Sequence, residues 1–412
     1  MIIKRLIKGF SESIRYMKLI PISIVSILLL LPLWGCSAEH NDSLPATVSK
    51  LDNLIRIPAD IQPIYDITIQ KDIDIGNINI EKELMGGIND IAVDDSGRVY
   101  LADTQQKTIH VFSSDGQFLQ NLGRRGSGPG EFGHIFDMKI QGNRLFAFDP
   151  TLYRINYYSL ETMSFDRVEG LFFQDWSDIQ NIDQASPVKF YDWGGDNNML
   201  IGFRQIMGPN IYYYIVKNSN HRTNIISNPI IIQKQDRESE LIVKFGNVEI
   251  PVTPPFARKS LIAVSKDRHI FSAWTDLFLI KEYDPEGVYL RAWYYPYNNQ
   301  PLTQADLDSF AASMGLKSNI QRALDGNKLP SSWPALYNMK IDDQGRFWIS
   351  TVIKDHSKTE WWVLEKDGTL LARFTWLRGK SIGEIKNNYL YTIETDLENG
   401  LQKVGRYRIK MH

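Results

Sequence analysis

Three oxygen-bearing side chains stand at the same place in three similar segments of the sequence. They are Asp90 in NDIAVDDSGR, Asp137 in FDMKIQGNR and Asn338 in YNMKIDDQGR. Carboxylate and amide oxygens are ligands that Ca²⁺ prefers. If the segments converge on one axis, these side chains could hold Ca²⁺ or another hard cation, or they could hold ordered water. Leu261 and Ile382 occupy the matched position in two other segments, so the ring of ligands would be incomplete.

Four further residues could bind a ligand by charge or by stacking. Arg124 and Arg125 lie in the loop GRRGSGPGEF and could bind an anion or stay solvated. No helix is expected after this loop, so it matches neither a P-loop nor a dinucleotide fingerprint. The adjacent pair Trp361-Trp362 falls in an expected strand and must point to opposite sides. One of the two could therefore be exposed and stack on a sugar or anchor a partner protein, whereas packing between sheets is the alternative.

His134 is the one histidine near these segments that could act as a general base or a metal ligand. A hydrogen-bonded structural histidine is the alternative reading. The other six histidines form no cluster in the sequence.

Short strands joined by tight turns would position these residues. Between Ile88 and Phe132 we expect four strands, at 91–93, 98–102, 108–112 and 117–122. The turns DDSG and SSDG join the first and second pairs, because Asp and Ser bond the turn backbone and Gly supplies positive φ. Four antiparallel strands joined by hairpins make one propeller blade.

This segment resembles the NHL repeat. The elements that carry the resemblance are IAVDDSGRVYLAD, KTIHVFSSDGQF and GRRGSGPGEF. The resemblance implies that GRRGSGPGEF is the connection between two blades and that Phe132 packs there. NHL-like propellers are often interaction modules.

Degenerate copies of the same unit follow along the chain. Their inner strands are expected to begin near residues 90, 137, 190, 261, 338 and 382. The sequence therefore predicts an all-β, six-bladed β-propeller of four-stranded antiparallel blades. As a whole it resembles the six-bladed propeller lipoproteins of Bacteroidetes-like bacteria.

Wider gaps between two pairs of copies predict insertions at about 221–259, read as a loop or hairpin, and at about 297–334. In the second, Thr303 can cap a short helix over QADLDSFAASM, with Asp306 at its third position. The last blade has only three strands of its own. We expect residues 65–69, with 72–80 behind them, to complete it and close the ring, which removes free sheet edges.

The N-terminus predicts export and a lipid anchor. Basic residues precede an uncharged apolar run from Leu19 to Trp34, and Gly35-Cys36 follows it directly. This pattern resembles the lipobox of bacterial lipoproteins, which implies lipid attachment at Cys36, the only cysteine. A transmembrane anchor is the alternative, but the run of about 16 residues is shorter than the roughly 20 needed. Translation could begin at Met1 or at Met17.

The predicted organisation is a signal peptide over 1–35, a tether over 36–58 and the propeller over 59–412. The expected location is the cell envelope, at the periplasmic or the outer face of the outer membrane. The formal net charge is −2 with both signs mixed along the chain, so nucleic acid is not an expected partner. The expected partners are the membrane, through lipidated Cys36, and a protein or carbohydrate; the chain is expected to be a monomer.

Two functions fit the sequence. The first is a binding or interaction module without catalysis, with a protein or a glycan as its ligand. The second is a metal-dependent propeller enzyme of lactonase or lyase type that uses the central channel. Lactonase-like propellers hold Ca²⁺ with Glu, Asn and Asp, part of which Asp90, Asp137 and Asn338 could imitate, whereas the histidines of lyase-like propellers are missing from the inner-strand positions.

Overall fold

The computed structural model describes residues 44–76, 85–171, 185–193, 198–205, 210–219, 222–234, 240–315, 317–396 and 398–412. The chain forms two compact units, Met1–Ser49 and Lys50–His412, and every strand and helix named below belongs to the second. The expected signal peptide and Cys36 lie outside the described residues. A chain that begins at residue 37 therefore retains the whole of the second unit.

An aspartate anchors the tight turn of the first hairpin. One Asp94 oxygen accepts hydrogen bonds from the backbone N–H groups of Ser96 and Arg98, and the other accepts from the Arg98 and Tyr100 side chains. Gly97 takes a positive φ of 83° at the same turn. Asp342 makes the equivalent contacts with Arg346 and Trp348. The turn chemistry of the sequence therefore predicts these hairpins correctly.

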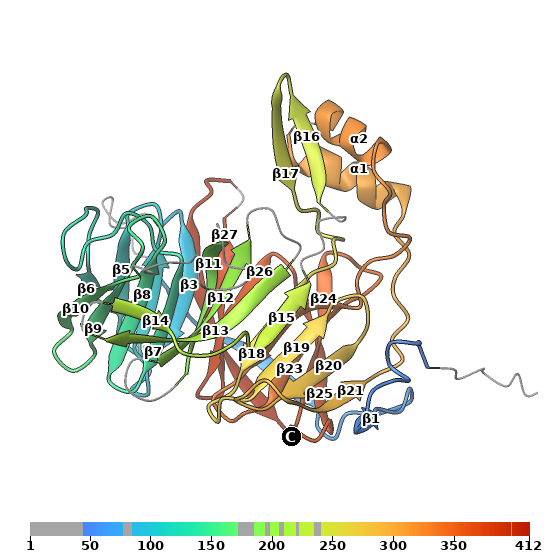
Figure 1. Cartoon of the computed structure of the whole chain (residues 1–412), viewed down its shortest axis with the longest axis horizontal. Coiled ribbons are helices and arrows are strands. Elements are labelled where there is room, and N and C mark those ends of the chain that lie inside the picture. Colours follow the sequence, from blue (N-terminus) through green and yellow to red (C-terminus); the bar gives the residue numbers. More distant parts are fainter. Residues whose placement is uncertain are drawn as a thin grey trace, which may run out of the picture. The chain divides into compact units, whose positions relative to one another are not determined.

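Six sheets of four or five strands make up the described part of the second unit, apart from one separate hairpin (Figure 1). The first blade is β3 (Ile88–Val93), β4 (Val99–Asp103), β5 (Thr108–Phe112) and β6 (Phe118–Leu122). The second is β7 (Asp137–Gln141), β8 (Arg144–Asp149), β9 (Arg154–Ser159) and β10 (Ser164–Gly170). The third is β11 (Ala185–Asp192), β12 (Asn198–Gln205), β13 (Asn210–Ser219), β14 (Arg222–Ile225) and β15 (Ile231–Lys234).

The remaining blades follow the same antiparallel pattern. The fourth contains β18 (Ser260–Val264), β19 (Ile270–Trp274), β20 (Leu279–Tyr283) and β21 (Tyr289–Tyr294). The fifth contains β22 (Leu336–Ile341), β23 (Phe347–Val352), β24 (Lys358–Leu364) and β25 (Leu370–Leu377). The sixth contains β26 (Lys380–Lys386), β27 (Tyr389–Thr395) and β28 (Gln402–Met411). The six predicted inner strands are confirmed as β3, β7, β11, β18, β22 and β26.

A buried apolar cluster fills each interface between neighbouring blades. Between the first and second blades, for example, Tyr100 and Leu122 pack with Leu145 and Tyr158, and Phe132 of the connecting loop lies among them. Five further clusters join the second blade to the third and so on around the ring to the sixth and first. Each blade therefore buries both of its faces, and Phe132 packs where the sequence places it.

The N-terminal part of the second unit closes the ring, as predicted. β2 (Ile67–Ile75) pairs antiparallel with β28, from Ile67 opposite Met411 to Ile75 opposite Val404, and becomes the outer strand of the sixth blade. A second N-terminal strand is new. β1 (Leu54–Arg56) pairs parallel with β21 as a fifth strand of the fourth blade, within a segment that the sequence assigns to the tether.

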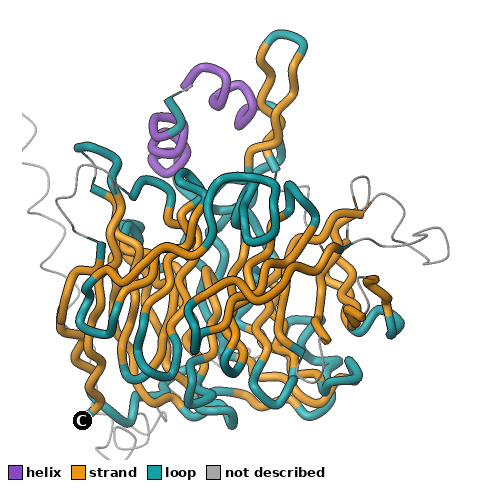
Figure 2. The backbone as a smooth tube through the Cα atoms, turned by 90° about the vertical axis from the view of Figure 1, so that its left-hand side faces the viewer, coloured by secondary structure: helices purple, strands orange, loops and turns teal. Residues whose placement is uncertain are grey.

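The two predicted insertions fold together. β16 (Leu241–Phe245) and β17 (Val248–Val252) form a hairpin, and α1 (Gln304–Ser313) and α2 (Lys317–Asp325) come from the second insertion. Their apolar residues, such as Val243, Phe310 and Leu324, share one buried cluster. We name β16, β17, α1 and α2 the lobe; it projects from one side of the sheets (Figure 2). Neither helix in this described part has the length and apolar character that crossing a bilayer requires.

The insertion boundaries need one correction. β14 and β15 fall inside the expected first insertion, yet both pair with β13 and belong to the third blade. The predicted helix cap is confirmed, because Thr303 and Asp306 form a reciprocal capping box at the start of α1.

Ring closure predicts a specific loss of stability. Ile75 of β2 is fully buried in the cluster between the sixth and first blades. We expect Ile75→Ala to lower the free energy of unfolding by about 2–4 kcal/mol, because it leaves a cavity at this interface. Gln70→Ala, on an exposed position of the same strand, should change it by less than about 0.5 kcal/mol. Urea unfolding of the chain from residue 37 measures both, and equal effects would contradict closure by β2.

Candidate functional site

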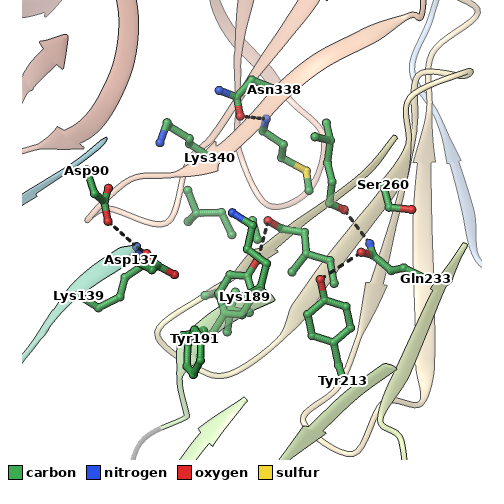
Figure 3. Close-up of a pocket in the computed structure, with 18 of the residues that line it drawn as sticks. Asp90, Asp137, Lys139, Lys189, Tyr191, Tyr213, Gln233, Ser260, Asn338 and Lys340 are labelled. Atoms are coloured by element: carbon green, nitrogen blue, oxygen red, sulfur yellow. Dashed lines mark hydrogen bonds and ion pairs between the residues drawn. The ribbon is translucent and has the colours of Figure 1, made fainter. Parts of the chain in front are cut away.

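A cavity of about 770 Å³ lies between the inner strands. Every blade contributes to its wall, with Asp90, Asp137, Tyr191, Leu261, Asn338 and Glu384 coming from the first to the sixth in order. The two insertions that form the lobe lead into β18 and β22, which are the inner strands of the fourth and fifth blades. Polar and charged side chains from different blades point into the same space (Figure 3).

The three residues predicted to hold a metal do line the cavity, and the side chain of each accepts the backbone N–H of the next residue. Asp90 Oδ1 accepts the backbone N–H of Ile91 at 3.0 Å, and Asp137 Oδ1 accepts that of Met138 at 3.0 Å. Asn338 Oδ1 accepts the backbone N–H of Met339 at 2.8 Å. The shared position of these residues therefore has a local structural role in all three blades.

Lys139 joins Asp90 and Asp137 into a charged triad. Its Nζ lies 2.7 Å from Asp137 Oδ1 and 3.5 Å from Asp90 Oδ2, and Asp90 Oδ2 also accepts the Met138 N–H at 2.9 Å. Burial raises the pKa of Asp90 and the Asp137 carboxylate raises it further, although Lys139 opposes both. Burial also acts to raise the pKa of Asp137, but Lys139 holds it below the ordinary value.

This triad does not fit a Ca²⁺ site. Three of the four carboxylate oxygens of Asp90 and Asp137 already accept hydrogen bonds or ion pairs, and an ammonium group stands between the two side chains. Within the described residues, no three His, Cys, Asp or Glu side chains gather as a metal site would require. The chemistry of the donors thus favours a cluster of lysine and carboxylate ion pairs over a metal centre.

Lys340 and Glu384 lie beside the triad. The matching of repeated segments in the sequence did not identify them. Lys340 Nζ donates to the Gly383 carbonyl at 2.6 Å. Burial lowers the pKa of Lys340 and raises that of Glu384. Lys139, Lys340 and Glu384 share one position, because each stands two residues after the aligned residue of its blade, namely Asp137, Asn338 or Ile382. Each of the three also pairs with an aromatic residue on the next strand.

Two further lysines complete the polar wall. Lys189 stands on β11, and Lys259 precedes β18 with its Nζ 4.9 Å from the centre of the Tyr337 ring. Surrounding atoms lower the pKa of Lys259, and Lys189 lowers it further, although the Lys259 side chain still reaches water. Neither lysine has a carboxylate within ion-pair distance among the described residues.

Aromatic and apolar side chains from the third and fourth blades form another part of the wall. Tyr213 donates to Gln233 Oε1 at 3.3 Å, and Gln233 Nε2 donates to the Leu261 carbonyl at 3.2 Å. Tyr191 donates to the Ile262 carbonyl at 3.4 Å, at the limit of a hydrogen bond. These contacts fix the two tyrosine rings against the cavity (Figure 3). The cavity wall therefore combines cationic groups with fixed aromatic rings, and Lys189 and Tyr191 even share the strand β11.

The remaining predicted ligand residues do not line this cavity. Arg124 is 82% exposed and pairs with Glu131, and Arg125 donates to the Gln105 carbonyl; both lie in the loop between the first two blades. The backbone N–H of His134 donates to Asp149 and its side chain is half-buried. The structure thus does not bring His134 or the two arginines together with the triad.

The expectation that Trp361 or Trp362 is exposed is wrong. Trp361 is 4% exposed and packs between the fifth and sixth blades, and Trp362 is 1% exposed and packs between the fourth and fifth. The two rings do point to opposite sides, but both sides of a blade face a neighbour. Neither ring has a surface on which a sugar could stack.

Comparison with known proteins supports this architecture. A family model described as a 6-bladed beta-propeller matches residues 75–233, which include the first three blades. The chain is a six-bladed β-propeller. The likeness of residues 88–132 to the NHL repeat stays a prediction, because the matching model does not carry that name. None of the curated proteins matches the chain.

Solved structures resemble this propeller at low sequence identity. A member of the DUF4221 family from Bacteroides vulgatus has a TM-score of 0.52 and 11% identity, over 84% of this chain and 99% of that one. A Bacteroides fragilis protein whose name describes it as exported has a TM-score of 0.49 and 12% identity, over 87% and 99%. Virginiamycin B lyase from Staphylococcus aureus has a TM-score of 0.40 and 10% identity, over 83% and 99%. At these identities the likeness concerns the fold alone.

The triad of Asp90, Asp137 and Lys139 predicts that a Lys139 variant loses stability in a pH-dependent way. Lys139→Met should lower the free energy of unfolding at pH 8 by about 1–3 kcal/mol, less than for a fully buried pair because water reaches the cavity. Without Lys139, burial and mutual repulsion raise the pKa values of Asp90 and Asp137 in the folded state. Protonation of these two carboxylates then stabilises the folded state at low pH, and this contribution is lost as the pH rises through the raised pKa values. The defect should therefore shrink between pH 8 and pH 5, as chemical unfolding at the two values measures.

A matched background checks that reading. In Asp137→Asn protein one carboxylate charge is already absent, so Lys139→Met should cost less and depend less on pH. A defect of the same size at both pH values in both backgrounds would show that Lys139 contributes packing alone.

Proposed function

We propose that this protein is a lipid-anchored, non-catalytic binding propeller of the bacterial cell envelope that takes a small ligand into its central cavity. The observation that carries the proposal is the cavity of about 770 Å³, whose wall combines charged side chains with aromatic and apolar ones. Its ligand is a saccharide or a short peptide segment. The volume lies within the range of about 300–1,000 Å³ that small-molecule sites occupy.

The rigidity of the wall supports a binding role. Most cavity residues stand on inner strands, and the blades that carry them are packed on both faces. Side chains such as Asp90, Asn338 and Gln233 are held by hydrogen bonds to the backbone. A site that is ordered before the ligand arrives loses little conformational freedom on binding.

The enzyme alternative has less support. It needs Asp90, Asp137 and Asn338 as metal ligands, but Lys139 and backbone N–H groups already engage most of their oxygens. The same contacts suit a cavity whose polar wall is preset for binding.

The anchor rests on the sequence. The Gly35-Cys36 step after the apolar run is the pattern for lipid attachment, and it places the propeller at a membrane surface in the envelope. Residues between Cys36 and the first strand at Leu54 would connect the lipid to the blades.

Blocking the cavity tests the binding role. The chain from residue 37 is titrated with a panel of neutral and acidic oligosaccharides and short peptides, and its thermal unfolding is recorded. A ligand at 100 times its Kd should stabilise the protein by about 2.7 kcal/mol. Leu261→Trp and Ile211→Trp, which each add a ring at the cavity wall, should abolish this effect.

Leu119→Trp is the matched control, because Leu119 is 48% exposed on the outer strand β6 and should leave binding unchanged. A ligand that binds all three variants equally well would place the binding site elsewhere. A panel without a single stabilising ligand would contradict a binding role for the cavity.

Lipid attachment has a separate test. Full-length protein is produced in a Gram-negative host and its N-terminus is analysed by mass spectrometry. We expect a mature chain that begins at Cys36 and carries acyl groups, and Cys36→Ala should accumulate as the uncleaved precursor. A mature chain that begins at another residue, or an acylated product of Cys36→Ala, would contradict the anchor.

A further inference from the structure

Positive charge exceeds negative charge around the cavity. Six cationic side chains line it, namely Lys139, Lys189, Lys259, Lys266, Arg268 and Lys340, against the three carboxylates of Asp90, Asp137 and Glu384. The whole chain carries a formal net charge of −2, so this excess is local to the cavity. A cleft lined by one sign of charge attracts ligands of the other sign.

The carboxylates do not neutralise this excess. Asp90 and Asp137 both pair with Lys139, so one of their two charges is compensated within the triad. The charge that remains lies near Lys189 and Lys340 without forming an ion pair with either. Glu384 makes no ion pair among the described residues. Two of the three acids are therefore committed within the triad, and the other lysines face the cavity without such a partner.

Lys189, Lys259 and Lys340 line the cavity without an ion pair among the described residues. Lys259 contacts the face of the Tyr337 ring, and Lys340 donates to a backbone carbonyl. Neither they nor Lys189 have a carboxylate within 4 Å in the described part of the chain. Lys189 is close enough to both others to act on them as a like charge. Grouping like charges in a partly closed space is unfavourable unless a counter-charge joins them.

We infer that Lys189, Lys259 and Lys340 bind an oxyanion group, a carboxylate or a phosphate ester, carried by a small organic ligand. The inference rests on the proposed function, because it names the chemical class of the ligand that enters the same cavity. An ammonium group donates three hydrogen bonds and acts as a point charge, which suits either kind of oxyanion. Hydrogen bonds to a charged group are stronger than neutral ones.

The aromatic and apolar part of the wall suits the organic part of such a ligand. Tyr191 directs its hydroxyl toward the Ile262 carbonyl and is only partly buried, so part of its ring is left for the ligand. Tyr213 is 2% exposed and packs between the third and fourth blades, where it supports this wall from behind. Ile211, Ile262 and Met339 add apolar surface. A sugar ring or another compact carbon framework could lie against this wall while its acidic group reaches the lysines.

Isothermal titration calorimetry in low salt tests the inference. The chain from residue 37 is titrated with inorganic phosphate, citrate and trigalacturonate, and with the neutral galactose trimer. We expect one or more of the oxyanions to bind at least 10-fold more tightly than the neutral trimer, and the affinity to fall as NaCl is added. Lys189→Met and Lys259→Met should each weaken that binding by about 10- to 100-fold.

Lys410→Met, on the exposed outer part of the sixth blade, is the control and should bind as the unaltered protein does. Binding of citrate and trigalacturonate alone identifies a carboxylate ligand, and binding of phosphate as well identifies a phosphate-bearing one. Lys189 is exposed at the cavity and its replacement leaves the triad intact, so a folded variant is expected in any case.

Equal affinities for the acidic and neutral trimers, or unchanged binding by both lysine variants, would overturn the inference. If the neutral trimer still binds and Leu261→Trp removes that binding, the proposed function stands and only the ligand class is wrong. If none of the probes binds, the oxyanion site is contradicted, and the wider ligand panel decides the proposed function separately.

Discussion

The pairing of β2 with β28 is the contact on which the rest of the structure depends. It joins the beginning of the second unit to its end, from Ile67 opposite Met411 to Ile75 opposite Val404. It supplies the fourth strand of the sixth blade, and Ile75 enters the cluster that joins this blade to the first. A ring of blades encloses a cavity only if its last interface is made. The backbone hydrogen bonds of one strand and the burial of a few isoleucines therefore hold the whole site in place.

The closed ring also accounts for the character of the site. Inner strands from all six blades bring charged residues together that are far apart in the sequence, such as Asp90, Lys189 and Glu384. Within this group, Lys139 pairs with two carboxylates, whereas Lys189, Lys259 and Lys340 have no ion pair among the described residues. The two insertions, by contrast, leave the ring and form the lobe around an apolar cluster that Tyr337 and Val352 of the fifth blade also join.

Local patterns explain what could be predicted from the sequence. Turn residues such as Asp94 and Asp342 satisfy their own backbone, and Thr303 caps α1 through a contact three residues away. Such signals gave the six blades, the inner strands, the helix and the closing strand. The cavity was harder, because its lysines acquire meaning only when the strands converge. Glu384 was missed because it stands two residues beyond the aligned position at Ile382. The exposed side that Trp361 or Trp362 could have had is absent, because burial by a neighbouring blade is a tertiary effect.

Amide hydrogen exchange of the chain from residue 37 tests the central claim most directly. If β2 closes the ring, the paired amides of residues 67–75 exchange as slowly as those of β28 and become exposed in the same cooperative event. If these amides exchange as fast as an unstructured tail while β27 and β28 remain protected, the ring is not closed by β2. The cavity described above would then lack the contact that encloses it.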